Sequence, residues 1–235
     1  MIEFQSVSYA FDEVPVLRDV SLTIDDGAFV VLAGANGSGK TTLLRHCNGL
    51  LTADSGEVLV DDTPVAENLL AARSTVGMVF QHPRDQFVAA TIGADVAFGP
   101  ENLGLERADI DRRVDAALEA VNMAGRETER IETLSGGEQS RVAIAGALAM
   151  EPAHVVLDEP FTGLDDPARR SVLSRLESLA ADGTGVLLAT HDLRDVLGLA
   201  DRVVAMQDGR VVVDEPPERA LEQLTGLEVR VPTEC

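Results

Sequence analysis

Residues 29–41 have the sequence FVVLAGANGSGKT, an apolar run that leads directly into a glycine-rich turn ending in Lys40 and Thr41. The run 29–33 predicts a buried strand. The turn fits the pattern G-x-x-x-x-G-K-[ST], which places backbone N–H groups around phosphate oxygens. A helix is expected to follow, and its N-terminus would add a positive partial charge. A ligand-free turn is the alternative, but the flanking strand and helix favour a phosphate-binding loop.

The side chains of this loop have separable chemical roles. Lys40 is expected to reach the β- and γ-phosphates of a nucleotide, and Thr41 is expected to coordinate Mg²⁺. Lys40 is the only lysine among the 19 basic residues, so every other basic position is an arginine. The chain therefore keeps a compact point charge where phosphate binding needs one. The predicted nucleotide-binding residues of the loop are Gly34, Ala35, Asn36, Gly37, Ser38, Gly39, Lys40, Thr41 and Thr42.

A second apolar strand, expected at 155–157, ends in two carboxylates, Asp158 and Glu159. Asp158 suits coordination of Mg²⁺, directly or through water. Glu159 suits a general base for the attacking water or a residue that positions it. Two solvated acids at a strand end are the alternative in a chain with 40 acidic residues. The phosphate loop earlier in the chain favours the catalytic interpretation.

The rest of the chain alternates apolar strands with helices, which predicts an α/β protein with a parallel sheet. Residues 2–25 are expected to form strands around a turn at 12–15. Helices are expected after the phosphate loop, over 109–124 and over 135–150. Further strands are expected at 57–60, 76–80, 186–189 and 203–206.

Several motifs follow the phosphate loop in a fixed order, namely Leu134–Glu138 (LSGGE), Asp158–Pro160, Gly163–Asp165 and Thr190–Asp192. Together they resemble the nucleotide-binding domains of ATP-binding cassette (ABC) proteins over about residues 2–214. The resemblance implies a P-loop NTPase with a RecA-like core, an antiparallel β-subdomain and a helical subdomain. The implied segments are 1–82 and 151–214 for the core and β-subdomain, 83–150 for the helical subdomain, and 215–235 for a short C-terminal segment.

The motif LSGGE, called the signature below, also has a physical interpretation of its own. Ser135 and Glu138 have the spacing of a capping box at the start of a helix. Gly136 and Gly137 would leave backbone N–H groups open to an anion. A helix cap alone is the alternative. The resemblance implies that these four residues cover the γ-phosphate of ATP held by a second ATPase subunit, in a head-to-tail dimer that encloses two ATP molecules.

The resemblance assigns further side chains. Gln81 matches a glutamine that senses Mg²⁺ and the membrane partner, His191 matches the switch histidine at the γ-phosphate, and Asp165 matches a residue that links the two sites. Phe11 is expected to stack on adenine, with Tyr9 as the alternative. The residues expected to carry catalysis are Glu159, His191 and Gln81, and those expected to hold Mg²⁺ are Thr41, Gln81 and Asp158.

Residues 80–105, with the sequence FQHPRDQFVAATIGADVAFGPENLGL, resemble the energy-coupling-factor ATPases that drive uptake of cobalt, nickel, biotin and other vitamins. The resemblance implies an ATPase on the cytoplasmic face of the cell membrane. Its implied partners are a second ATPase subunit, which is another copy or a related chain, a transmembrane scaffold and a substrate-binding membrane protein. The alternatives are the ATPase of a conventional ABC importer or exporter and a soluble ABC ATPase outside transport.

The composition narrows these alternatives. The net charge of −21 opposes binding to nucleic acid. No apolar stretch approaches the ~20 residues of a transmembrane helix, and residues 1–9 lack the features of a signal peptide. Cys47 and Cys235 are far apart and lack metal-ligand spacing, so both are expected to be reduced thiols.

The acidic, lysine-poor composition predicts adaptation to high salt. Molar salt shortens the Debye length to ~3 Å and screens the repulsion among like charges. We therefore expect the helical circular dichroism signal to fall when KCl is lowered from molar concentration to about 0.1 M, where the Debye length is about 10 Å. Full ellipticity together with an unchanged unfolding temperature in the dilute buffer would contradict this adaptation.

Overall fold

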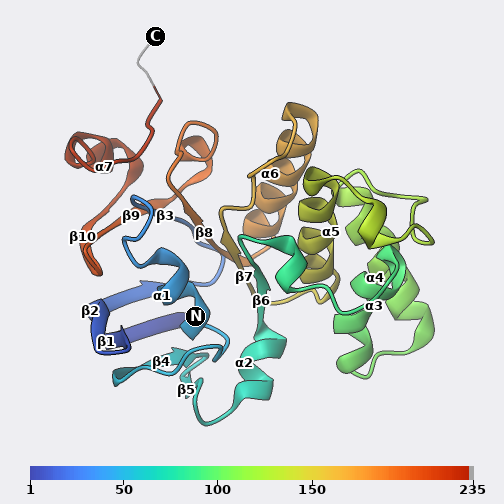
Figure 1. Cartoon of the computed structure of the whole chain (residues 1–235), viewed down its shortest axis with the longest axis horizontal. Helices are drawn as coiled ribbons and strands as arrows, with labels where there is room; N and C mark the ends of the chain where they lie inside the picture. The colour runs from blue at the N-terminus through green and yellow to red at the C-terminus, as the bar shows by residue number, and fades with distance from the viewer. Residues whose placement is uncertain (233–235) are drawn as a thin grey trace.

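The computed structural model of the chain describes residues 1–232 and contains two β-sheets with helices on and between them (Figure 1). The main sheet has the strand order β10-β9-β3-β8-β7-β6. The strands from β9 to β6 are parallel, and β10 pairs antiparallel with β9. The predicted parallel α/β sheet is therefore confirmed. The strand bounds are β3 Phe29–Ala33, β6 Val76–Val79, β7 His154–Asp158, β8 Gly185–Thr190, β9 Arg202–Gln207 and β10 Arg210–Glu215.

The second sheet is antiparallel, in the order β2-β1-β4-β5. Between β1 and β2 the two turn residues Asp12 and Glu13 both have positive φ, 45° and 69°. Two such residues form the tight hairpin turn that suits the twist of the flanking strands. The predicted turn at 12–15 begins where the observed turn does and extends two residues into β2. The bounds are β1 Ile2–Phe11, β2 Val14–Ile24, β4 Ser55–Val60 and β5 Thr63–Pro64.

The main sheet is buried on both faces, which explains why its strands are continuous apolar runs. In β3, Phe29 and Val31 belong to a cluster with the large helices, whereas Val30 and Leu32 belong to a cluster with the antiparallel sheet. Successive side chains of a strand point to opposite faces, so one run serves both layers. Helix α1 (Lys40–His46) joins the second cluster through its buried leucines and follows the phosphate loop directly.

Helices α3, α4 and α5 pack on one another at one end of the molecule, away from the antiparallel sheet (Figure 1). Ser135 caps α5 and Met150 ends it, as the predicted helix 135–150 requires. The predicted helix 109–124 is α4, which begins two residues earlier and ends before Asn122, whose φ is +57°. The bounds are η1 Pro83–Asp85, α3 Ile92–Asn102, α4 Arg107–Ala120, η2 Ile131–Thr133 and α5 Gly136–Ala149.

Helix α6 (Asp166–Ala181) was not predicted, although its sequence carries the signals of a helix. Asp165 accepts a hydrogen bond from the Ala168 N–H and so caps the helix, and a proline lies in its first turn. Its buried residues Ala168, Val172 and Leu176 recur at four-residue intervals. The other elements not predicted individually are β5, α2 Leu69–Thr75, η1, α3, η2, η3 Leu197–Leu199, β10 and α7 Pro217–Gln223.

The predictions for the two cysteines and for membrane-spanning segments can be compared with the structure. Cys47 is a free, buried cysteine, and burial raises the pKa of its thiol to about 12, so the thiol is protonated. Cys235, with the end of the predicted segment 215–235, lies outside the described residues. Across residues 1–232, the structure contains no helix with the length and apolar character that crossing a bilayer demands.

Candidate functional site

The phosphate loop connects β3 to α1, and its backbone depends on glycine. Gly34 has a φ of +151°, and a Cβ there would approach the carbonyl oxygen of Met206 to 2.6 Å. Within the loop, the buried Lys40 Nζ donates to the carbonyl oxygens of Gly34 at 2.7 Å and Ala35 at 3.1 Å. Burial lowers the pKa of Lys40, an effect that the nearby carboxylates oppose. The ammonium is thus already positioned over the loop that would hold the phosphates.

The two predicted Mg²⁺ ligands of the loop and of the acidic strand end are in contact. Thr41 Oγ1 donates to Asp158 Oδ2 at 2.6 Å. Asp158 is 2% exposed, and its Oδ1 has no hydrogen-bond partner among residues 1–232. Burial raises the pKa of Asp158, while the hydrogen bond from Thr41 opposes the increase. A buried carboxylate oxygen without a partner, beside a threonine hydroxyl, is suited to bind a divalent cation. Thr41 and Asp158 therefore fit a Mg²⁺ site.

Glu159 follows directly and is held by the loop after β8. Its carboxylate accepts hydrogen bonds from Thr190 Oγ1 at 3.1 Å and from the His191 backbone N–H at 3.0 Å. His191 Nδ1 lies 2.8 Å from Glu159 Oε1. Glu159 has a φ of +47°, a conformation that costs a non-glycine residue energy and that clusters at functional sites. The structure therefore brings together the predicted base and the predicted switch histidine.

An open cavity unites the predicted nucleotide-binding and metal-binding residues. Gln81, which follows β6, faces it together with residues of the phosphate loop and the acidic strand end. The cavity is lined by Val16, Asn36, Gly37, Gly39, Lys40, Thr41, Thr42, Gln81, Asp158 and Glu159. The geometry therefore places two threonines, two carboxylates, two side-chain amides and the lysine around one space.

The predicted adenine-stacking residue lies outside this lining. Phe11 is 44% exposed and stands edge-on to Tyr9, with ring centroids 4.8 Å apart. Tyr9 in turn stands edge-on to the buried His46. Val16 is the residue of β2 that lines the cavity. Stacking of Phe11 or Tyr9 on a base thus stays a prediction.

The signature residues surround a different cavity, shared with the loop before α6. The capping box is present, because the Glu138 N–H donates to Ser135 Oγ and Glu138 Oε2 accepts from the Ser135 N–H. A Cβ on Gly137 would lie 2.5 Å from the Gly163 carbonyl oxygen, so this contact needs glycine. The lining residues are Ser135, Gly136, Gly137, Glu138, Arg141, Gly163, Leu164, Asp165 and Ala168. Within one chain, the signature and Lys40 therefore face separate spaces.

Two side chains that sequence analysis missed connect these parts. Gln86 Oε1 accepts from the Phe80 N–H at 2.9 Å, and Gln86 Nε2 donates to the Ala143 carbonyl oxygen at 3.1 Å. Gln86 therefore ties the backbone beside Gln81 to α5. Arg126 pairs with Glu138 at 2.7 Å. Hydrogen bonds from Ser135, followed by the one from Arg126, lower the pKa of Glu138 to about 2, so the cap stays ionised.

A match to a known protein family identifies the family of the chain. Residues 17–162, which include the phosphate loop, the signature and both catalytic carboxylates, match the family described as ABC transporter. The chain belongs to the ABC transporter family. Members of this family hydrolyse ATP to power transport, so the chain is an ABC ATPase.

Curated relatives narrow the assignment within the family. The chain is 60% identical over 99% of its length, and 100% of the relative's, to a protein of Halobacterium salinarum with the assigned name of an ABC transporter ATP-binding protein. It is 44% identical to the energy-coupling factor transporter ATP-binding protein EcfA1 of Caldanaerobacter subterraneus, over 97% of this chain and 84% of that one. It is 45% identical to the cobalt import ATP-binding protein CbiO of Syntrophus aciditrophicus, over 95% and 81%. The chain is thus an ABC ATPase of the energy-coupling-factor type.

Solved structures agree. The structure of cbiO1 from Clostridium perfringens, described as part of the ABC transporter complex cbiONQ, matches with a TM-score of 0.82 at 32% identity. The match covers 94% of this chain and 90% of that one. The dimeric ATP-binding cassette MJ0796 in a post-hydrolysis state with ADP and Pi matches with a TM-score of 0.84 at 28% identity, over 92% and 99%. The predicted P-loop fold is therefore confirmed.

The contacts of Glu159 generate a prediction for catalysis. The variant Glu159→Gln keeps the shape of the side chain but cannot act as a base. We expect ATP turnover to fall by about 10²-fold or more, the scale of general-base catalysis, with ATP affinity retained. Steady-state phosphate release and equilibrium binding of a fluorescent ATP analogue measure the two quantities.

The comparator is Lys40→Ala, which should lose ATP affinity itself because the phosphates lose their point charge. Wild-type turnover in Glu159→Gln would contradict the assignment of the base. Unchanged ATP affinity in Lys40→Ala would contradict the assignment of the phosphate loop.

Proposed function

We propose that this chain is the ATP-hydrolysing subunit of an energy-coupling-factor importer for cobalt ions. One observation carries the proposal at the level of the site: Thr41 and Asp158, and Glu159 and His191, are in direct contact beside Lys40. That arrangement supplies a phosphate cradle, a cation site and a base in one cavity. The likeness to CbiO and cbiO1 supports cobalt as the transported ion.

Catalysis is mainly electrostatic in this proposal. Thr41 and Asp158, with Gln81, would hold Mg²⁺, whose charge offsets that of the β- and γ-phosphates. Lys40 and the N-terminus of α1 add further positive potential in a site partly withdrawn from water. Glu159 orients the attacking water and accepts its proton, and its contacts with Thr190 and His191 fix the carboxylate for that step.

A second ATPase subunit completes the site. The backbone N–H groups at the start of α5 face a cavity that Lys40 does not share, so they have no phosphate to bind within their own chain. In a head-to-tail dimer they would cover the γ-phosphate held by the other subunit. The dimeric ATP-binding cassettes with which this chain shares its fold support that arrangement.

Transmission to the membrane would pass through the loop after β6. Gln81 senses the nucleotide, and Gln86 carries a shift of this backbone to α5 through its hydrogen bonds to Phe80 and Ala143. ATP-driven closure of the dimer would then move the helices α3 to α5, on the cytoplasmic face of the membrane. The partners are a transmembrane scaffold and a membrane protein that binds the solute.

The relative from Halobacterium salinarum supports function at high salt.

The test is affinity capture of this chain from native membranes in molar KCl, followed by mass spectrometry of the proteins that co-purify. We expect a small membrane scaffold and a separate small membrane protein. The latter, separated from this chain after capture, should itself bind Co²⁺ in an isothermal titration, with Mg²⁺ titration as the control.

Large permease chains without a separate binding protein would keep the ATPase and overturn the importer type. Capture of the expected proteins without Co²⁺ binding would overturn cobalt as the solute.

A further inference from the structure

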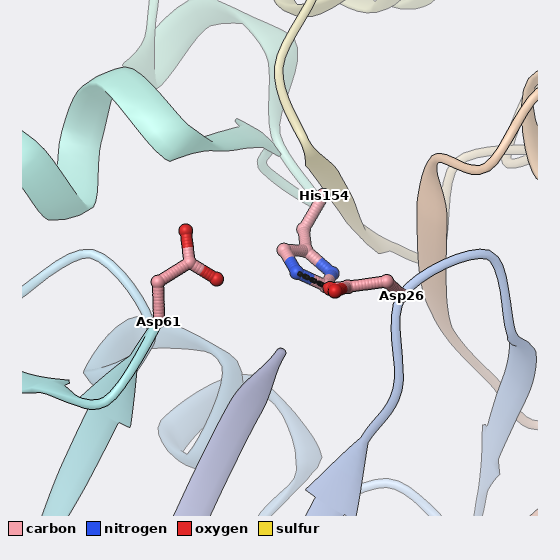
Figure 2. Close-up of side chains that lie close together, drawn as sticks. All are labelled: Asp26, Asp61 and His154. Atoms are coloured by element: carbon pink, nitrogen blue, oxygen red, sulfur yellow. Dashed lines mark ion pairs between the residues drawn. The ribbon is translucent and has the colours of Figure 1, made fainter.

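We propose that Asp26, Asp61 and His154 form a binding site for a divalent first-row transition metal ion (Figure 2). The three residues come from separate segments. Asp26 lies in the turn between β2 and β3, Asp61 in the turn between β4 and β5, and His154 at the start of β7. One ligand atom from each lies within 4.8 Å of the others. The site is at the opposite end of β7 from Asp158, so it is distinct from the nucleotide site.

The histidine is what distinguishes this cluster from ordinary surface acids. His154 is 1% exposed, and within the described part of the chain neither ring nitrogen has an aligned hydrogen-bond partner. Its Nε2 lies 3.0 Å from Asp26 Oδ1, and Asp61 presents its carboxylate from the other side of the ring (Figure 2). Because burial lowers the pKa of His154, the imidazole is neutral and offers a lone pair. A buried lone pair without a partner is the feature that a metal ion would satisfy.

The ring is held rigidly while the carboxylates are free to adjust. A Cβ on Gly185 would lie 2.2 Å from His154 Nδ1, so the imidazole fills space that only glycine leaves open. Asp26 and Asp61 are 70% and 57% exposed in their side chains. Around an ion with ligand distances of about 2.0–2.2 Å, the donor atoms stand closer together than 4.8 Å. Small rotations of the two exposed carboxylates close that gap.

A positive group already lies between the carboxylates. The amino group of Met1 donates to Asp61 Oδ1 at 2.8 Å and also contacts Asp26. In this structure the ammonium balances the charge of the two carboxylates, and a divalent ion would displace it. One imidazole and two carboxylates suit zinc or cobalt, with water completing the coordination. The ion would join turns of the antiparallel sheet to a strand of the main sheet and so stabilise the boundary between the two.

The test is titration of the tag-free, nucleotide-free and Mg²⁺-free full chain with CoCl₂ in molar KCl, followed by visible absorption of protein-bound Co²⁺. We expect saturable binding of one ion and a rise in the unfolding temperature.

Asp61→Asn, at an exposed position, and His154→Gln should weaken Co²⁺ binding by about tenfold or more, the scale for loss of a ligand or its support. Asp62→Asn, the exposed neighbour, is the matched control and should bind Co²⁺ normally. Asp158→Asn should also bind normally, which separates this ion from one in the nucleotide site.

Absence of a saturable band, or equal affinity in Asp61→Asn, His154→Gln and the unmodified chain, would overturn the site. The outcome does not depend on transport, so it is separable from the proposed function.

A second, independent observation concerns the segment 225–232, from which we infer that Arg230 positions the loop of His191 through its backbone. The Arg230 N–H donates to the His191 carbonyl oxygen at 2.8 Å, and the Leu193 N–H donates to the Arg230 carbonyl oxygen at 2.8 Å. The two bonds hold the backbone at His191 and at Leu193, directly after the His191 contact with Glu159. Apolar side chains of the same segment pack on the core, and residues 226–228 line a pocket together with residues 35–38 of the phosphate loop.

The backbone origin of this effect permits a sharp comparison. Arg230→Pro removes the N–H that bonds to His191, whereas Arg230→Ala removes only the side chain, whose guanidinium lies 3.9 Å from Asp192. Since small displacements of a catalytic group cost up to about 10²-fold in rate, we expect Arg230→Pro to lower kcat about tenfold or more. The KM for ATP should change little, and Arg230→Ala should resemble the unmodified chain.

A chain ending at Leu224 should show the same loss of kcat as Arg230→Pro, with the unfolding temperature recorded for each variant. Equal kcat in Arg230→Pro and Arg230→Ala, or a normal kcat in the shortened chain, would overturn the positioning role.

Discussion

The hydrogen bond between Thr41 and Asp158 joins positions 117 residues apart in the chain, and the proposed site depends on it. It can form only because β3 and β7 both flank β8 in one parallel sheet, so that their carboxyl ends meet. The contact leaves the second oxygen of a buried carboxylate without a partner. An unpaired buried oxygen of this kind is costly, and a bound cation would remove the cost. The folding of the sheet and the preparation of the cation site are therefore one event.

The fold was largely predictable because the apolar runs of the main sheet are buried on both faces. Residues 29–33, 155–157 and 186–189 could be recognised as strands without knowing their neighbours. Helix α6 was not predicted because charged residues interrupt its apolar positions and only three of its residues are buried, although Asp165 and the following proline mark its start. The predicted and observed helix boundaries differ by a few residues where a positive-φ residue such as Asn122 ends the helix.

Site residues could be predicted where a sequence motif identifies their chemical role. They could not be predicted where their role depends on a tertiary contact. Lys40, Asp158 and Glu159 stand in motifs, and the structure gathers them. Gln86 forms hydrogen bonds to the backbone of Phe80 and of Ala143, a residue of α5. Nothing in the sequence around Gln86 indicates these contacts. Stacking of Phe11 on adenine stays a prediction, because Phe11 is exposed and is not among the residues that line the cavity. Spacing along a chain does not determine which way a side chain at a hairpin end points.

The separation of the two cavities makes the central claim testable, namely that the start of α5 acts on ATP held by another subunit. Gly136→Asp suits the purpose, because a Cβ at Gly136 meets open space and an acidic residue in the first turn favours a helix. The measurement is the ATPase rate of the Gly136→Asp chain, of the Lys40→Ala chain and of their mixture. Each chain alone should be inactive and the mixture should regain activity, since one pairing restores an intact loop opposite an intact signature. Normal hydrolysis by the Gly136→Asp chain alone would show that a single chain suffices and would contradict the account.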